Sequence, residues 1–198
     1  MNAFLIGEHL FIVFLTVVFT MAAGLPLGIY AYMSPGARRV ILWTAEILQT
    51  IPALALLGII MVFAGAGKAT VISGLTLYSM LPVVHNTYLG LSEVNPAIRE
   101  AAAGMGMSRL YRLLHVELPI AFPVIFTGVR IATVTAIGAA VFAAFVGGGG
   151  LGSIIYRGIH TQNIRLIISG TVSLMGMAIV FDTVMAAIEG KLHRHKRS

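Results

Sequence analysis

The glycine-rich run Gly147–Ser153 contains the residue type that lets a backbone approach phosphate groups closely. Its pattern fits G-x-G-x-x-G and comes close to a P-loop. A P-loop, however, needs lysine where Ser153 stands, and a dinucleotide fingerprint needs a preceding strand within a βαβ unit. Here a long apolar stretch comes before the run. The sequence therefore offers no ATP site, and ATP-driven work would require a separate ATPase subunit.

Acid, base and nucleophile residues are scattered along the chain without a recognisable catalytic spacing. The residues considered for such chemistry are Glu46, His85, Ser173 and Asp182. The absence of cysteine excludes disulfides, thiolate metal sites and cysteine nucleophiles. We therefore expect no enzyme activity, no catalytic residue, no metal and no cofactor.

The composition predicts an all-α membrane protein. Apolar residues make up 58% and charged residues 10% of the 198-residue chain, against about 45–50% and about 25% in soluble domains. The excess of apolar side chains must face lipid, so we expect a single transmembrane domain over residues 1–198. Five hydrophobic stretches have the length that a membrane span needs: Leu10–Met33, Val40–Ala64, Thr70–Leu91, Phe122–Val146 and Ile164–Ile188.

The basic residues predict the orientation of these spans, because cytoplasmic loops are enriched in lysine and arginine. With the N-terminus outside and the C-terminus inside, the outer segments hold only Lys68, Arg157 and Arg165. The inner segments then hold Arg38, Arg39, Arg99, Arg109, Arg112, Lys191, Arg194, Lys196 and Arg197. The basic tail 190–198 is therefore interpreted as a cytoplasmic anchor at the lipid surface rather than as a nucleic-acid site.

Polar residues within the apolar stretches are costly in lipid and should face protein or a water-filled cavity. The candidates for a transport path are Gln49, Thr50 and Pro52 in the second stretch and Asn86 in the third. The plainer alternative is that the polar side chains only form hydrogen bonds between helices. Pro52 and Pro82 each remove a backbone donor, which suits helices that bend during transport.

Other polar residues in the spans have structural interpretations. Arg130 and Asp182 are hypothesised to pair, and Glu189 has a similar position near the inner interface. His85 and His115 are interpreted as structural.

The polar segment 92–119 between the third and fourth stretches has the signals of two short helices. Asn95 can cap the first helix, with Pro96 at its first position. Gly104 and Gly106 then interrupt it, and Ser108 can cap the second. Pro119 is expected to prevent a simple continuation into the fourth span. We therefore expect a compact helical knob on the cytoplasmic side.

This segment resembles the EAA motif of the permease subunits of bacterial binding-protein-dependent ABC importers, and we refer to residues 92–119 as the EAA loop. The matching residues are Glu100-Ala101-Ala102, Gly106 after three residues, Val116 after nine more, and Leu118-Pro119. The resemblance implies a type I importer permease fold in the bacterial inner membrane. It also implies that the loop couples to the ATPase through Glu100, Ala101, Ala102, Gly104, Gly106 and Leu110.

Three further stretches, 46–55, 81–96 and 145–152, resemble the osmoprotectant branch of that family, whose members import glycine betaine, carnitine, choline or proline. The resemblance implies partners: ABC ATPase subunits, a second permease that is identical or homologous, and an extracytoplasmic binding protein. It also assigns Gly148 and Gly149 to the neighbourhood of an outer gate. The alternatives are another small zwitterion or cation as substrate, or an ATP-independent channel or carrier.

Overall fold

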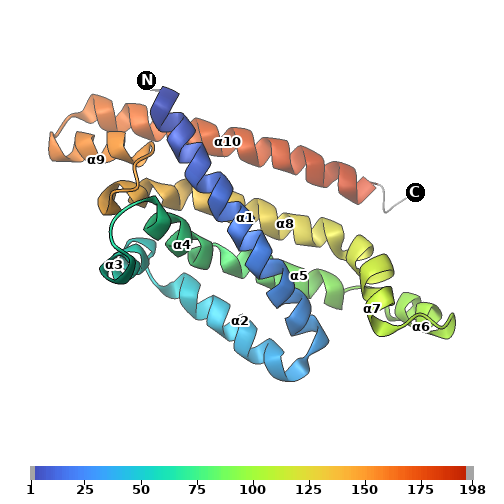
Figure 1. Cartoon of the computed structure of the whole chain (residues 1–198). Helices are drawn as coiled ribbons and strands as arrows, with labels where there is room; N and C mark the ends of the chain where they lie inside the picture. Colours follow the sequence, from blue (N-terminus) through green and yellow to red (C-terminus); the bar gives the residue numbers. More distant parts are fainter. Residues whose placement is uncertain (1–2, 195–198) are drawn as a thin grey trace.

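The computed structural model describes residues 3–194, and these residues form helices and connecting turns without any strand. The predicted all-α class is confirmed. Figure 1 shows the helices in chain order. They are α1 (Ala3–Met33), α2 (Pro35–Thr50), α3 (Ala53–Ala64), α4 (Lys68–Tyr78), α5 (Met80–Ser92), α6 (Pro96–Gly104), α7 (Arg109–Arg112), the π-helical turn η1 (Leu113–Glu117), α8 (Leu118–Ala139), the 3-10 segment η2 (Ala140–Val146), α9 (Gly152–His160) and α10 (Ile164–Arg194).

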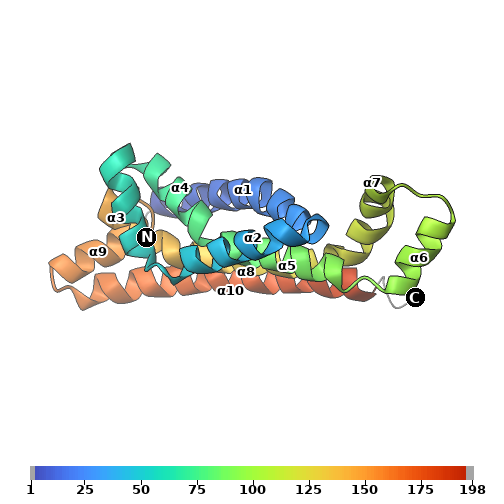
Figure 2. The same ribbon diagram turned by 90° about the horizontal axis from the view of Figure 1, so that it is seen from below.

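Helices α1, α5 and α8 pack against one another at the centre, and α10 runs beside α8. An apolar cluster of buried side chains lies towards each end of this bundle. One surrounds Leu57, Val71 and Ile137 near α3 and η2, whereas the other surrounds Leu91 and Leu113 near the EAA loop. Helices α3 and α9 lie at one end of the molecule, and α6 and α7 project from the other (Figure 2). We call these the glycine end and the loop end.

Two of the five predicted spans are broken. The stretch 40–64 bends by 99° between α2 and α3, because Ile51 and Pro52 have extended backbones and a residue before proline avoids the helical region. The stretch 70–91 is divided at Ser79 into helices of 11 and 13 residues. Among the described residues, three helices are long and apolar enough to span a membrane, or up to four if the bent pair counts as one span.

The prediction that Pro119 prevents continuation into the fourth span is wrong. Helical backbone runs without a break from Arg109 to Val146, so the second helix of the loop is the start of a long one. The reason is the π-helical turn η1, in which the Leu118 N–H donates to the Leu113 carbonyl five residues earlier. Pro119 directly follows this widened turn, where the regular hydrogen-bond ladder is already interrupted, so its missing N–H costs little.

Helix α10 exposes large apolar side chains along much of its length, including Ile168, Val172, Ile179 and Val184. A helix of this kind needs lipid or a partner helix around it. Of the predicted basic tail 190–198, residues 195–198 lie outside the described part of the chain.

Candidate coupling loop and transport path

The EAA loop begins with the capped helix that its sequence predicts. The Asn95 side chain accepts a hydrogen bond from the Ala97 N–H at 2.9 Å, and Pro96 occupies the first turn of α6. At the second helix, the Ser108 hydroxyl accepts from the Tyr111 N–H at 3.3 Å. Both caps satisfy backbone donors that a helix start leaves without partners.

Helix α6 ends in a Schellman motif centred on Gly106. The Met107 N–H donates to the Ala102 carbonyl at 3.2 Å, and the Gly106 N–H donates to the Ala103 carbonyl at 2.9 Å. This geometry requires a left-handed residue, and Gly106 has φ of +83°. The glycine of the EAA pattern is therefore the residue that turns the chain from α6 back towards α7.

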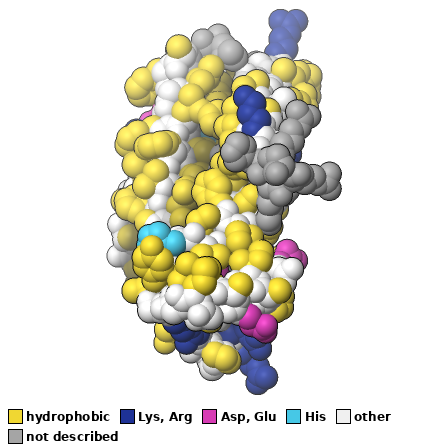
Figure 3. All heavy atoms as spheres, turned by 90° about the vertical axis from the view of Figure 1, so that its right-hand side faces the viewer, with side chains coloured by type: hydrophobic (Ala, Val, Ile, Leu, Met, Phe, Trp, Pro, Cys, Tyr) yellow, Lys and Arg dark blue, Asp and Glu magenta, His cyan; other side chains and the backbone are white. Residues whose placement is uncertain are grey.

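The predicted coupling residues do not all face outward. Glu100, Ala101, Gly104 and Leu110 are exposed, whereas Ala102 is only 2% exposed and packs inside the loop. Exposed apolar side chains, among them Ile98 and Met105, surround this surface. Seen from the loop end, hydrophobic side chains cover much of the molecule, with charged side chains at several places between and below them (Figure 3). The loop thus presents a small, largely apolar surface with Glu100 on it.

A polar cluster fastens the loop to the end of α1. The Tyr32 hydroxyl donates to Glu117 Oε2 at 2.6 Å and accepts from the Arg99 guanidinium at 3.1 Å. Arg112 Nε donates to Glu117 Oε1 at 2.8 Å. We call these four residues, Tyr32, Arg99, Arg112 and Glu117, the Tyr32 cluster.

Sequence reasoning did not find the Tyr32 cluster. Its only signals are a glutamate among apolar residues just before Leu118-Pro119 and a tyrosine at the end of an apolar stretch. Nearby, Arg109 also donates to the Met33 carbonyl at 2.7 Å. The last turn of α1 is therefore bound by α6, α7 and η1 together.

Two of the predicted path residues come together in an open hollow of about 340 Å³ between α2, α5 and α8. Asn86 lies there with its amide donating to the Pro82 carbonyl at 2.8 Å. Thr50 instead donates to the Ile47 carbonyl within its own helix, and Pro52 forms the exposed bend before α3. The hollow is lined by Glu46, Gln49, Leu81, Pro82, His85, Asn86 and Ile131.

The other two predicted path residues, Gly148 and Gly149, lie in the turn between η2 and α9 at the glycine end. Glu8 of α1 holds this turn: its carboxylate accepts from the Gly150 N–H at 2.7 Å and pairs with Lys68 of α4 at 2.7 Å. The structure does not bring Gly148 or Gly149 to the hollow that contains Gln49 and Asn86.

The hypothesised pair of Arg130 and Asp182 is confirmed, with Nε and Oδ1 2.8 Å apart. Arg130 also pairs with Glu189 at 2.8 Å, and Thr127 donates to the same carboxylate. These contacts join α8 to the second half of α10. Because one arginine meets two carboxylates that lie about two turns apart on the same face of α10, the group fixes the rotation of an otherwise exposed helix.

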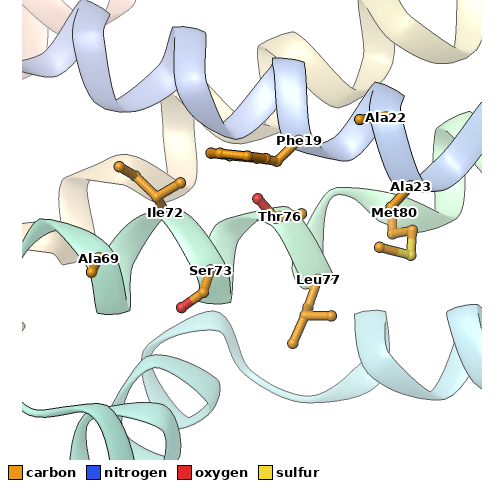
Figure 4. A pocket seen from close by; sticks show the side chains of 9 residues that line it. All are labelled: Phe19, Ala22, Ala23, Ala69, Ile72, Ser73, Thr76, Leu77 and Met80. Carbon is orange, nitrogen blue, oxygen red and sulfur yellow. The ribbon is translucent and has the colours of Figure 1, made fainter.

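A second, larger hollow of about 820 Å³ lies between α1 and α4. Figure 4 shows Phe19 from α1 above Thr76 and Ile72 from α4. Small and apolar side chains form most of its lining, which is the composition that favours packing of helices or lipid chains rather than of a charged solute. None of the predicted path residues lines it: it is bounded by Phe19, Ala22, Ala23, Ala69, Ile72, Ser73, Thr76, Leu77 and Met80.

The chain is similar to solved importer subunits over nearly its whole length. An inward facing structure of the MetNI methionine ABC transporter matches with a TM-score of 0.84 and 24% identity, covering 93% of each chain. An amino acid ABC transporter with histidines matches with a TM-score of 0.77 and 19% identity, covering 94% of this chain and 91% of that one. The predicted type I importer fold is confirmed.

Curated relatives are similar at the level of sequence. The glycine betaine/carnitine/choline transport system permease protein OpuCB of Bacillus subtilis (strain 168) is 40% identical over 187 residues, covering 94% of this chain and 86% of the relative. The osmoprotectant import permease protein OsmW of Salmonella typhimurium is 37% identical, covering 92% of this chain and 87% of the relative. Residues 24–195 match the family described as binding-protein-dependent transport system inner membrane component, and the chain belongs to that family.

Proposed function

We propose that this chain is the membrane-spanning permease subunit of an ATP-driven importer for small quaternary ammonium osmoprotectants. Membership of the family makes it a multi-pass inner membrane component that works with an ATPase and a substrate-binding protein. The substrate class is supported by the relatives, which are named for glycine betaine, carnitine and choline transport.

The observation that carries this proposal is the EAA loop itself. It is a capped helix with a glycine-dependent turn, and it projects from one end of an apolar bundle. We place this end, and the C-terminus with it, in the cytoplasm, as the distribution of arginine and lysine favours. Glu100, Ala101, Gly104 and Leu110 would then meet the ATPase, while Ala102 supports the turn from within.

For the transport path we propose the hollow around Gln49 and Asn86. Its polar groups lie at membrane depth, where exposure to lipid is unfavourable, so a second permease should enclose them in a water-filled space. A quaternary ammonium group has no N–H to donate and is attracted by charge alone. Glu46 supplies a negative charge in this hollow, whereas Asn86 and His85 can meet the carboxylate of glycine betaine or carnitine, or the hydroxyl of choline.

In the proposed cycle, ATP closes the ATPase dimer and moves the EAA loops of the two permeases together. The path between the permeases then opens outward and accepts the ligand from the binding protein. Hydrolysis returns the path to its inward-open state. We place this change at the bend at Pro52 and the turn at Gly149, where the helices are interrupted.

Uptake by reconstituted complex tests the proposal. Liposomes containing the permease, its ATPase and its binding protein should accumulate labelled glycine betaine, carnitine or choline only with ATP. Liposomes containing the permease alone should accumulate none. Flux through the chain alone would establish the channel or carrier alternative, and ATP-dependent uptake of a different zwitterion would replace the proposed substrate.

Two loop variants test the coupling role. Gly106→Pro cannot adopt the positive φ, and Glu100→Lys reverses the charge of the exposed surface. Both should remain in the membrane but lose ATPase association and transport. Glu93→Lys is the matched control, since Glu93 is exposed at the end of α5, before α6 begins, and is not one of the predicted coupling residues. Normal co-purification of the ATPase with both loop variants would refute the assignment.

A further inference from the structure

The Tyr32 cluster joins segments that are distant in sequence at the end of α1. Tyr32 lies 67 residues before Arg99 and 85 residues before Glu117. One hydroxyl group makes both connections, because it donates to the carboxylate and accepts from the guanidinium. Helix α6 therefore reaches α1 through a single side-chain oxygen.

Arg99 places this connection beside the proposed ATPase surface. It is the neighbour of Glu100 on α6, but it is half-buried and points to Tyr32, whereas Glu100 is exposed. Adjacent residues of one helix thus face in different directions. A displacement of the exposed surface of α6 must move Arg99 with it.

Glu117 is the most buried residue of the Tyr32 cluster. Its side chain is 2% exposed, and both carboxylate oxygens are engaged, one by Tyr32 and one by Arg112. Apolar residues including Leu91, Val94 and Leu113 form the core next to it. Separating a buried carboxylate from its donors is strongly unfavourable, so the cluster favours movement of its elements as a unit.

The location of Glu117 in the π-helical turn adds a second connection. The turn leads directly into α8, which in turn is packed on α1 and α5. π-helical turns often occur at functional sites. Through Glu117, the start of α8 and the end of α1 share one carboxylate.

We infer that Tyr32 and Glu117 are positioning residues through which movement of the EAA loop is transmitted to α1. The Tyr32 hydroxyl is the coupling atom, with Arg99 of α6 on one side and Glu117, at the start of α8, on the other. This inference rests on the proposed importer function, and it goes beyond it by assigning a route of transmission through side chains that are not among the matching residues of the EAA motif.

Tyr32→Phe is the direct test, because it removes only the hydroxyl. Tyr30→Phe removes the same group two residues earlier, where the side chain is 56% exposed and its hydroxyl bonds to none of the described residues. In the full complex with ATPase and binding protein, Tyr32→Phe should keep ATPase association and basal ATP hydrolysis. Substrate transported per ATP should fall by about tenfold, as expected from losing a hydrogen bond to a charged group. Tyr30→Phe should transport as the parent does.

A distance measurement separates this inference from the choice of substrate. The chain has no cysteine, so Leu27→Cys on α1 and Ile98→Cys on α6 would give the only two spin-labelled positions in this chain. In the parent complex, the two labels should keep their separation when a nucleotide analogue binds, because α1 follows the loop. In the Tyr32→Phe background, the separation should change with nucleotide.

The outcomes are distinct. The inference would be overturned if Tyr32→Phe transported as much substrate per ATP as the parent and its label separation responded to nucleotide as in the parent. It would also be overturned if the only defect of Tyr32→Phe were loss of ATPase association. If Tyr32→Phe does not fold, Glu117→Gln is measured in the same way. It keeps the size of the side chain but replaces one acceptor oxygen by an NH2 donor, so it cannot accept from both Tyr32 and Arg112. Unchanged coupling in this variant would overturn the inference. Failure of the parent to transport any tested osmoprotectant would instead count against the proposed substrate, while the label distances would still decide the transmission route.

Discussion

Helix α1 is held by a carboxylate at each of its ends, but the two arrangements differ. At the loop end, Glu117 is 2% exposed and is bound by side chains, Tyr32 and Arg112. At the glycine end, Glu8 is 12% exposed and is bound by the Lys68 ammonium, which is 46% exposed, and by a backbone N–H. One end is a buried network of side chains, and the other is a partly solvated clamp on a turn.

The difference indicates different mechanical roles. A buried network with several side chains resists separation and moves as a unit, so it suits transmission. A partly exposed ion pair gives little stability and can open at small cost. The ion pair of Glu8 with Lys68 can thus open at smaller cost than the Tyr32 cluster, while His9, Ile12 and Val13 of α1 stay buried beside it.

The largest expected effect concerns the two carboxylates. Glu117→Ala leaves Arg112 and Tyr32 without their acceptor in a buried site, so the free energy of unfolding should fall by about 3–5 kcal/mol. Glu8→Ala removes a partly exposed pair and should cost about 1 kcal/mol. Unfolding of the two variants in the same detergent measures both values. Equal losses would abolish the distinction between the two ends.

A smaller effect is expected from the turn that Glu8 holds. Gly149 has φ of +82°, and a Cβ atom at this position would overlap the Glu8 carboxylate. Gly147 has φ of +76°, and its Cβ would meet Ala66 and Gly67 at ordinary contact distances. Both alanine variants carry the cost of positive φ, about 1–2 kcal/mol. Only Gly149→Ala should also displace the Glu8 carboxylate, which should lower the free energy of unfolding by about 1 kcal/mol more.

The comparison of Gly149→Ala with Gly147→Ala also tests whether Glu8 is the reason for the sensitivity. In a Glu8→Ala background the overlap disappears, so the two glycine variants should become alike. A persistent difference would mean that the turn is sensitive for a reason other than the clamp.

Local signals in the sequence were sufficient to predict the helix caps and the turn of the EAA loop. They were insufficient to predict the contacts that attach the loop to α1. Asn95 and Gly106 were predicted correctly because caps and left-handed turns depend on residues a few positions apart. Tyr32 and Glu117 are 85 residues apart, and no local pattern pairs them. The pairing of Arg130 with Asp182 could be anticipated because charges in a span must find partners.

The breaks in the predicted spans also could not be predicted from local sequence. Hydropathy predicted apolar stretches, but it does not report how the backbone responds to proline. Pro52 coincides with a bend of 99°, whereas Pro119 lies in continuous helix behind a π-helical turn. The difference depends on whether the preceding turn widens enough to accept the ring, which only the tertiary structure decides.

The smallest expected effect comes from ionic strength. Lys68 is nearly half exposed, so salt should screen its attraction to Glu8, whereas the buried contacts of Glu117 should be screened much less. The stability lost in Lys68→Gln should therefore be about 0.5 kcal/mol at low salt and should approach zero at about 1 M salt. The loss in Glu117→Gln should stay nearly constant over the same range, as measured by unfolding at each salt concentration. If Lys68→Gln were as insensitive to salt as Glu117→Gln, the ion pair at the glycine end would have to be as enclosed as the one at the loop end, and the distinction between the two carboxylates would lose its physical basis.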